Sequence, residues 1–545
     1  MPGQRWVKVP IGPHSPQWTT VRTERTVLAV VHNLTAATRL LDLLPLVADD
    51  PRVQVVFTCP GSSPFSGRTE EWLHEREMAV IPWSQAIQVE FDLAISASYG
   101  GDLRDLLAPL VVVPHGMGYN KYSPGNRKSE IGNRKSVFGL SSRWLLSDGE
   151  LIPSLIVLSH EEQLTRLAAA VPEAAERALV AGDPCFDRLL AGLPLRPSYR
   201  ATLGVTDTQR LVLVCSTWGP DSLYGNDPQL IRRLLEALPL DDYRIVVALH
   251  PAVWDAHSRW QLHRWLAECT RAGAVVLPPE EGWRAATIAA DLVIGDHSSL
   301  SFYAAALGRP VLLATAPAHA VDPDSAVGRF LATAPPLAAD LRAAVDQAIA
   351  THDPATAAEV TSLATSAPGE SAPLLRKAFY QLLALPEPSA PARLAAPPLP
   401  PAAPEPVAAQ LVQVRLDLPK ATVTRHPAEL LRQQSVMPPG AHLAADTTEP
   451  YRAWLDLAEV VLHTHTPVTA AWVAATLAAL PSCQVAAGPL DASSWLAGTR
   501  DGRLFRYLAD GLTGRLAASV LRVAGDLPPE LTIEVGGRTV QATRK

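Results

Sequence analysis

Short apolar runs that alternate with segments of helical periodicity dominate the chain up to Leu313. A β-branched run at Thr26–Val31 is followed by a helix-period segment at Leu34–Val47. The alternation then repeats with apolar runs at Val53–Phe57, Met78–Ile81, Asp92–Ser96 and Leu110–Val113. Continuous apolar strands separated by helices are typical of parallel sheets covered on both faces. The pattern predicts an α/β fold, and a second series of the same kind begins at Arg210.

The second series centres on Ala289–Leu313. We expect a buried strand at Leu292–Gly295, a polar turn, a helix, and a further strand at Pro310–Leu313. The turn carries good N-cap residues at Asp296, Ser298 and Ser299. A hydroxyl-rich turn at a helix N-terminus offers free N–H groups and a positive dipole end, which suits a phosphate. An ordinary capped helix without a ligand fits this stretch equally well.

Other polar residues also follow predicted strands. His115 and Gly116 come after Leu110–Val113, and His250 comes after the strand Tyr243–Leu249. Ligands of open α/β sheets bind outside the carboxyl ends of the strands. A lone histidine is usually structural, but one followed by glycines at such an edge favours a functional role. The two series could therefore face each other across a shared cleft.

Composition limits the class of protein. At 545 residues the chain is too long for one core, and its net charge of -7 indicates no nucleic-acid partner. Five scattered cysteines without a CxxC pair predict neither disulfides nor zinc. With no signal-like or membrane-spanning apolar run, we expect a cytoplasmic protein. The basic segment Tyr119–Trp144 is either a solvated loop or a flap that meets an anionic substrate or a membrane surface, so peripheral membrane association stays open.

Shifts in composition predict the domain boundaries. A proline- and alanine-rich linker separates the two α/β series from a C-terminal module without a recognisable motif. In that module His463-Thr464-His465 could ligate a metal, but packing or partner binding is the favoured interpretation. We expect an N-terminal extension at 1–25, Rossmann-like domains at 26–196 and 205–385, the linker at 386–407, and an accessory domain of unknown role at 408–545.

From His115 to Ser299 the motifs resemble those of the CDP-glycerol glycerophosphotransferase family, which makes teichoic-acid-like polyol phosphate polymers on a GT-B fold. The resemblance covers roughly Thr26–Leu385. It rests on five segments in the family's order: Pro114-His115-Gly116, Gly182-Asp183-Pro184 with Asp187 and Leu189, Ser216-Thr217-Trp218, Leu249-His250-Pro251, and Gly295–Ser299 followed by Phe302–Leu312.

The resemblance implies an architecture and a set of roles. It implies two Rossmann-like domains, the first binding an acceptor and the second a nucleotide-diphosphate-linked donor. His115 would be the catalytic base, for which its ordinary pKa near 6.5 is suitable, and Gly116 would lie on the acceptor side. The donor phosphates and nucleotide would contact His250, Asp296, His297, Ser298, Ser299, Ser216 and Thr217.

The expected reaction is transfer of a glycerol-phosphate, polyol-phosphate or glycosyl group to a hydroxyl acceptor, with a membrane-associated acceptor left open. No aspartate pair suited to a metal is evident, so we expect no metal and no cofactor. The chain departs from the family at Cys185, Ala248 and His297, close to the presumed donor phosphates. Two alternatives therefore remain: an enzyme resembling the UDP-N-acetylglucosamine 2-epimerases, which have Asp-Ser-Gly-Gly at the turn starting at Asp296, and a non-catalytic nucleotide-binding scaffold.

Overall fold

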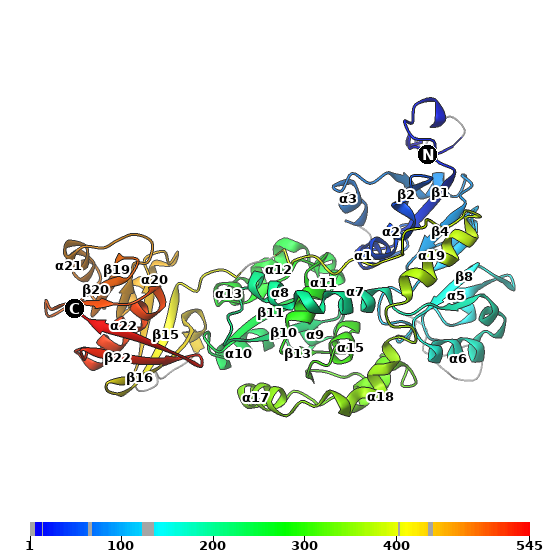
Figure 1. The fold of residues 1–545 in the computed structure, drawn as a ribbon. Helices are drawn as coiled ribbons and strands as arrows, with labels where there is room; N and C mark the ends of the chain where they lie inside the picture. Colours follow the sequence, from blue (N-terminus) through cyan, green and yellow to red (C-terminus); the bar gives the residue numbers. More distant parts are fainter. Residues whose placement is uncertain (1–5, 13–14, 64–67, 123–135, 402–403, 434–439) are drawn as a thin grey trace.

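A computed structural model describes residues 6–12, 15–63, 68–122, 136–401, 404–433 and 440–545. Figure 1 shows the three parts of the chain in a row: the N-terminal α/β domain, a second α/β domain in the middle, and a barrel at the opposite end. The two α/β domains face each other in a GT-B-like arrangement, which confirms the predicted fold class.

The N-terminal domain is built on a parallel sheet of seven strands in the order β3-β2-β1-β4-β5-β8-β9. Its central strands are buried on both faces, as their unbroken apolar sequences predict. The strand order reverses between β1 and β4, which opens a crevice at their carboxyl ends. The strands are β1 (Arg25–Val30), β2 (Val53–Cys59), β3 (Val80–Pro82), β4 (Leu93–Ser96), β5 (Leu110–Val112), β8 (Leu155–Leu158) and β9 (Ala178–Val180).

The second domain repeats this plan with five parallel strands in the order β12-β11-β10-β13-β14. Here the order reverses between β10 and β13, so its crevice lies beside the turn that follows β13. The helix after that turn is α15 (Ser299–Ala306), capped by the Ser298 hydroxyl. The strands are β10 (Arg210–Ser216), β11 (Tyr243–Leu249), β12 (Val275–Val276), β13 (Leu292–Gly295) and β14 (Val311–Leu313).

The chain crosses twice between the two domains. Helix α7 (Pro184–Gly192) packs its Phe186 and Leu189 into the core of the second domain. Helix α19 (Ser371–Leu382) returns, with Leu375 and Phe379 in the core of the first. Helix α19 accordingly contacts helix α2 (Pro45–Ala48) of the first domain. Each helix therefore buries its apolar face in the core of the domain other than the one to which the expected ranges 26–196 and 205–385 assign it.

The proline-rich linker contains no helix or strand over its described residues, 386–401 and 404–407. It is nevertheless fixed along both domains by its carbonyl groups. Arg52 donates to the carbonyl of Pro386 at 2.9 Å, and Tyr199 donates to the carbonyl of Pro397 at 2.6 Å. A proline residue has no backbone N–H to donate, but its carbonyl oxygen can accept a hydrogen bond. These two bonds hold the linker against both α/β domains.

The C-terminal module is a closed barrel that sequence patterns did not predict. Helix α22 (Gly511–Ala524) supplies Leu516, Ala517, Val520 and Leu521 to the same apolar core as the strands. Strands β22 and β23 form an antiparallel hairpin. The strands are β15 (Ala409–Asp417), β16 (Lys420–Pro427), β17 (Ala441–Asp446), β18 (Val460–Leu462), β19 (Val485–Asp491), β20 (Ser494–Thr499), β21 (Leu504–Leu508), β22 (Glu530–Val535) and β23 (Arg538–Arg544).

The barrel docks on the second α/β domain through an ion pair. Arg425 of β16 donates to both carboxylate oxygens of Asp241 at 2.8 and 2.6 Å, and both side chains are largely buried.

We expect Arg425→Ala to lower the free energy of unfolding by about 1–3 kcal/mol, because the Asp241 carboxylate loses its partner. Denaturant unfolding measures this. Arg415→Ala, on the exposed face of β15, is the matched control, and equal losses in the two variants would contradict the docking role.

Candidate functional site

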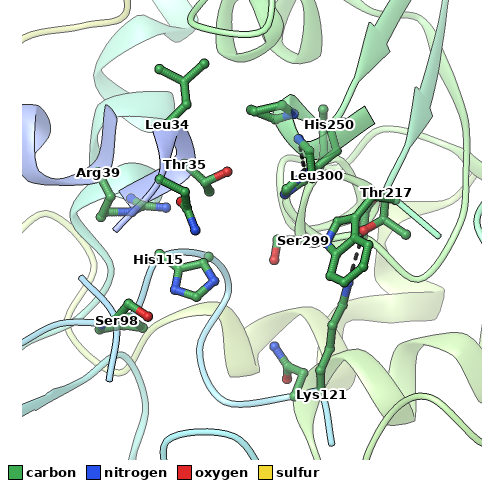
Figure 2. Close-up of a pocket in the computed structure, with 18 of the residues that line it drawn as sticks. Leu34, Thr35, Arg39, Ser98, His115, Lys121, Thr217, His250, Ser299 and Leu300 are labelled. Carbon is green, nitrogen blue, oxygen red and sulfur yellow. Dashed lines mark hydrogen bonds between the residues drawn. The ribbon is translucent and has the colours of Figure 1, made fainter. Parts of the chain in front are cut away.

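A cavity of about 760 Å³ lies where the carboxyl ends of the two sheets meet. The first domain contributes residues after β1, β4 and β5, and the second contributes residues after β10, β11 and β13. Figure 2 shows His115 on one wall and His250, Ser299 and Thr217 on the other. The wall includes eight of the nine residues expected at the site: His115, Gly116, Ser216, Thr217, His250, His297, Ser298 and Ser299.

His115 follows β5, and its ring is fixed by the first domain. Its Nδ1 lies 2.8 Å from the carbonyl oxygen of Ala97. A carbonyl only accepts, so Nδ1 carries the proton and Nε2 keeps a lone pair. Burial lowers the pKa of His115 below its ordinary value, and the positive charges of Arg39 and Lys121 lower it further, against the opposing effect of the Ala97 hydrogen bond. At neutral pH the ring is therefore neutral and its Nε2 is basic.

His250 follows β11 and holds the opposite tautomer. Its Nδ1 accepts a hydrogen bond from the backbone N–H of Ala252 at 3.1 Å and so caps α11 (Pro251–His257). The proton of the neutral ring is then on Nε2, which can donate to a ligand. Burial lowers the pKa of His250 to about 3, helped by Lys121 and His115. His250 thus offers a hydrogen-bond donor to the cavity, whereas His115 offers a hydrogen-bond acceptor.

The N-terminus of α15 also opens into the cavity. Ser298 caps the helix by accepting from the N–H of Ser301 at 3.2 Å, which leaves the first N–H groups of the helix, on Ser299 and Leu300, without intrahelical partners. The Ser299 hydroxyl also accepts from the backbone N–H of Met117 at 3.0 Å. This bond joins the two domains beside the cavity.

Gly116 makes that approach possible. A Cβ atom placed on Gly116 would lie 2.7 Å from the Ser299 Oγ, closer than such atoms normally approach. The glycine therefore lets the loop after β5 lie directly against the N-terminus of α15. Glycine serves here for its small size.

Asp296 does not line the cavity, contrary to the prediction that it shares the cleft wall. Its side chain is completely buried, and one carboxylate oxygen accepts from the backbone N–H groups of Thr217 at 2.8 Å and Leu223 at 2.9 Å. Asp296 thereby fixes the loop after β10, including Ser216 and Thr217, in place. Without Asp296, these two backbone N–H groups would be buried without hydrogen-bond partners, which is energetically costly.

Lys121 is a cavity residue that sequence reasoning did not single out. It comes from the basic segment Tyr119–Trp144, of which residues 123–135 lie outside the described residues. The Lys121 ammonium donates to the Thr217 hydroxyl across the cavity at 3.0 Å. Burial lowers its pKa, opposed by Asp296. Its position depends on the contact between domains, which sequence spacing does not reveal.

Two more buried basic residues line the first domain's wall and were also missed. His32 follows β1 and donates through Nε2 to the carbonyl of Gly100. Arg39, on helix α1 (Leu34–Leu43), is 5% exposed and reaches the same cavity. The sequence signal for Arg39 was an arginine within a largely apolar helix. An arginine is rarely buried without a partner, so a buried one would have indicated a site.

The described residues of the accessory barrel do not line this cavity. Both ring nitrogens of His463 form hydrogen bonds with threonine hydroxyls, to Thr447 at 2.7 Å and to Thr466 at 2.8 Å. Among the described residues, no group of three or more His, Cys, Asp and Glu side chains is arranged to hold a metal ion. No helix in the described ranges is long and apolar enough to cross a membrane.

No family model matches the chain, and no curated protein does. Among solved structures, it is similar to a variant of the wall teichoic acid polymerase TagF with CDPG (12% identity, TM-score 0.45, covering 67% of this chain and 90% of that one). It is also similar to S. aureus MnaA with UDP (13%, 0.40, 68% and 100%). A third is the UDP-GlcNAc 2-epimerase from Neisseria meningitidis with UDP-GlcNAc (12%, 0.38, 66% and 99%). At these values the likenesses assign no activity to this chain.

Proposed function

We propose that the chain is a group-transferring enzyme that binds a nucleotide-diphosphate-linked donor in the cavity and transfers a glycerol-phosphate, polyol-phosphate or glycosyl group to an acceptor hydroxyl. The observation that carries this proposal is the pair of facing histidines with opposite tautomers. One offers a basic Nε2 and the other an Nε2–H donor. Such a pair suits deprotonation of an acceptor on one wall and stabilisation of a leaving anion on the other.

In the proposed reaction, His115 Nε2 removes the proton of the acceptor hydroxyl as its oxygen attacks the donor. The bond formed joins that oxygen to the transferred group. The bond broken frees a nucleoside monophosphate if a polyol phosphate is transferred, or a nucleoside diphosphate if a sugar is transferred. The proton remains on His115 until solvent takes it, and the leaving anion carries the bonding electron pair.

The second wall is suited to that leaving anion. His250 Nε2–H, the ammonium of Lys121 and the N–H groups at the start of α15 all come from residues that line the cavity there. Hydrogen bonds that strengthen as negative charge develops lower the barrier, whereas equal binding of substrate and transition state does not. Arg or Lys residues and helix N-termini are common means of holding phosphates.

Donor identity is tested by thermal unfolding with CDP- and UDP-linked polyols and sugars. A ligand present at a hundred times its dissociation constant stabilises the folded state by about 2.7 kcal/mol. Donors that stabilise the chain are then incubated with polyol acceptors, and nucleotide release is measured. Stabilisation without any release would favour the scaffold alternative, and conversion of a UDP-sugar to its epimer would favour the epimerase alternative.

The tautomer and burial of His115 also predict a pH dependence. A general base works in its unprotonated form, and the pKa of His115 lies below the ordinary 6.5. We therefore expect kcat/KM to be flat around pH 7 and to fall as the pH drops through a value below 6.5. A pH profile of kcat/KM measures this, and a fall that begins above pH 7 on the acid side would contradict the assignment.

A further inference from the structure

The barrel is fixed to the second α/β domain by more than one ion pair. The backbone N–H of Leu240 donates to the carbonyl of Arg425 at 2.9 Å, and Arg271 donates to Glu429 at 2.5 Å. Leu430, which follows β16, is 3% exposed and belongs to the apolar core of the second domain. We therefore expect the barrel and the second domain to move as one body.

The linker connects this body to the first domain. Figure 1 shows it in yellow, running from the end of α19 past the second domain to β15. Its early part packs on the first domain, where Ala392 and Leu394 contact the apolar core. Arg376 of α19 donates to the carbonyl of Ala390 at 2.7 Å. Up to Leu394 the linker is therefore part of the first domain's surface.

The later part of the linker packs on the second domain. Pro397 is buried, and its carbonyl is the acceptor of the buried Tyr199 hydroxyl. A Cβ atom placed on Gly204 would overlap the ring of Pro404, so the linker lies directly against this glycine. The linker thus passes from one domain to the other between Leu394 and Pro397.

At this crossing the linker meets a buried ion cluster that itself joins the domains. Arg188 of α7 donates to the carbonyl of Ala395 at 2.8 Å and is paired with Asp42 of α1. Arg284 of the second domain donates to the same carboxylate at 2.7 Å. The linker is therefore a third connection between the two domains, beside α7 and α19.

The linker also has little slack. Nine prolines among residues 386–407 restrict φ and favour an extended backbone. An extended segment held at both ends cannot lengthen, so the two domains can separate only if the linker first leaves one of them. Opening the cavity therefore costs the hydrogen bonds and burial of the linker in addition to the contacts between the domains.

We propose that the barrel anchors the linker as a strap that holds the two α/β domains together around the cavity. Cleft enzymes commonly open and close by relative movement of their domains, and the strap would limit that movement. The accessory barrel thereby has a mechanical role in the second domain's attachment to the first. This role is independent of the proposed function, because its test needs no ligand and no turnover.

Two backbone amides report directly on separation of the domains. The N–H of Met117 donates to the Ser299 hydroxyl, and the N–H of Asp322 in the second domain donates to the carbonyl of Asn120 in the first at 2.8 Å. Both bonds break when the domains part, so hydrogen exchange at these two amides follows opening. Exchange in β1 and β10, inside the two sheets, follows unfolding of either domain instead.

The test lengthens the strap at its crossing in the full chain. Six alternating glycine and serine residues inserted between Leu394 and Ala395 leave every natural residue in place but add slack. We expect exchange at the amides of Met117 and Asp322 to become at least tenfold faster, with exchange in β1 and β10 unchanged. The same insertion after Asp501, in the exposed turn between β20 and β21, is the control and should change neither.

Tyr199→Phe tests the same strap by a smaller change, and it keeps the test valid if the lengthened chain does not fold. It removes only the hydroxyl that donates to Pro397, so we expect exchange at the two reporter amides to become about threefold faster or more. Tyr507→Phe is the matched control, because this buried tyrosine donates to the carbonyl of Gly514 within the barrel at 3.1 Å.

Unchanged exchange at both reporter amides in the lengthened chain and in Tyr199→Phe would overturn the inference. Faster exchange throughout β1 and β10 would overturn it as well, because the linker would then stabilise each domain rather than the contact between them. An equal effect of the strap changes and their controls would have the same meaning. Failure of the proposed function would appear separately, as absence of nucleotide binding or turnover.

Discussion

Replacing His115 by alanine should lower turnover about a hundredfold or more while leaving nucleotide affinity nearly unchanged. The ring's Nδ1–H is fixed on the Ala97 carbonyl, so the substitution removes the one basic nitrogen that we assign to the acceptor hydroxyl. Loss of a general base typically costs a factor of 10² to 10⁴. Steady-state kinetics with the best donor, together with calorimetric titration of the nucleotide, separates the two effects.

His74→Ala on helix α3 (Thr69–His74) is a suitable control, because His74 is exposed and absent from the cavity wall. The acid fall in the pH profile should disappear in His115→Ala and persist in His74→Ala. If His115→Ala abolished nucleotide binding but left the turnover of bound donor intact, the roles of the two walls would be reversed.

Replacing His250 by alanine should weaken nucleotide binding by about 1.5–3 kcal/mol, or roughly 10-fold to 150-fold in the dissociation constant. The reason is the loss of the Nε2–H that we assign to a donor phosphate. Calorimetric titration with CDP and UDP measures the change. An unchanged affinity would remove His250 from the phosphate site.

His250 also caps α11 through Nδ1, so part of any loss could come from the helix. His250→Asn is the matched variant, because an asparagine side chain restores the cap and with it about 1 kcal/mol of stability. Affinity lost in alanine but recovered fully in asparagine would assign the effect to the cap. If neither His115→Ala nor His250→Ala altered binding or turnover, the scaffold alternative would be favoured.

Much of the fold followed from local pattern. The strand expected at Leu292–Gly295 has those bounds in the structure, and Thr26–Val31 is displaced by one residue to Arg25–Val30. Unbroken apolar runs are diagnostic because a strand covered on both faces tolerates few polar residues. The barrel was missed because its strands mix parallel and antiparallel pairs, and periodicity does not reveal how strands pair.

Strand-end reasoning placed most candidate residues on one cavity wall or the other, but it could not tell which way a side chain turns. Asp296 shows this, since its carboxylate turns inward to the N–H groups of Thr217 and Leu223. Lys121 and Arg39 were missed for a different reason. Their importance depends on contacts between segments far apart in the sequence, which spacing along the chain does not contain.

The double crossing of the chain has a consequence for synthesis on the ribosome. The first sheet is complete at Val180, but its core also needs Leu375 and Phe379 of α19, almost 200 residues later. At about 5–20 residues per second, the apolar surface that α19 covers stays bare for roughly 10–40 s. During that interval the nascent first domain exposes apolar surface of the kind that chaperones bind. The core of the second domain is therefore completed before that of the first.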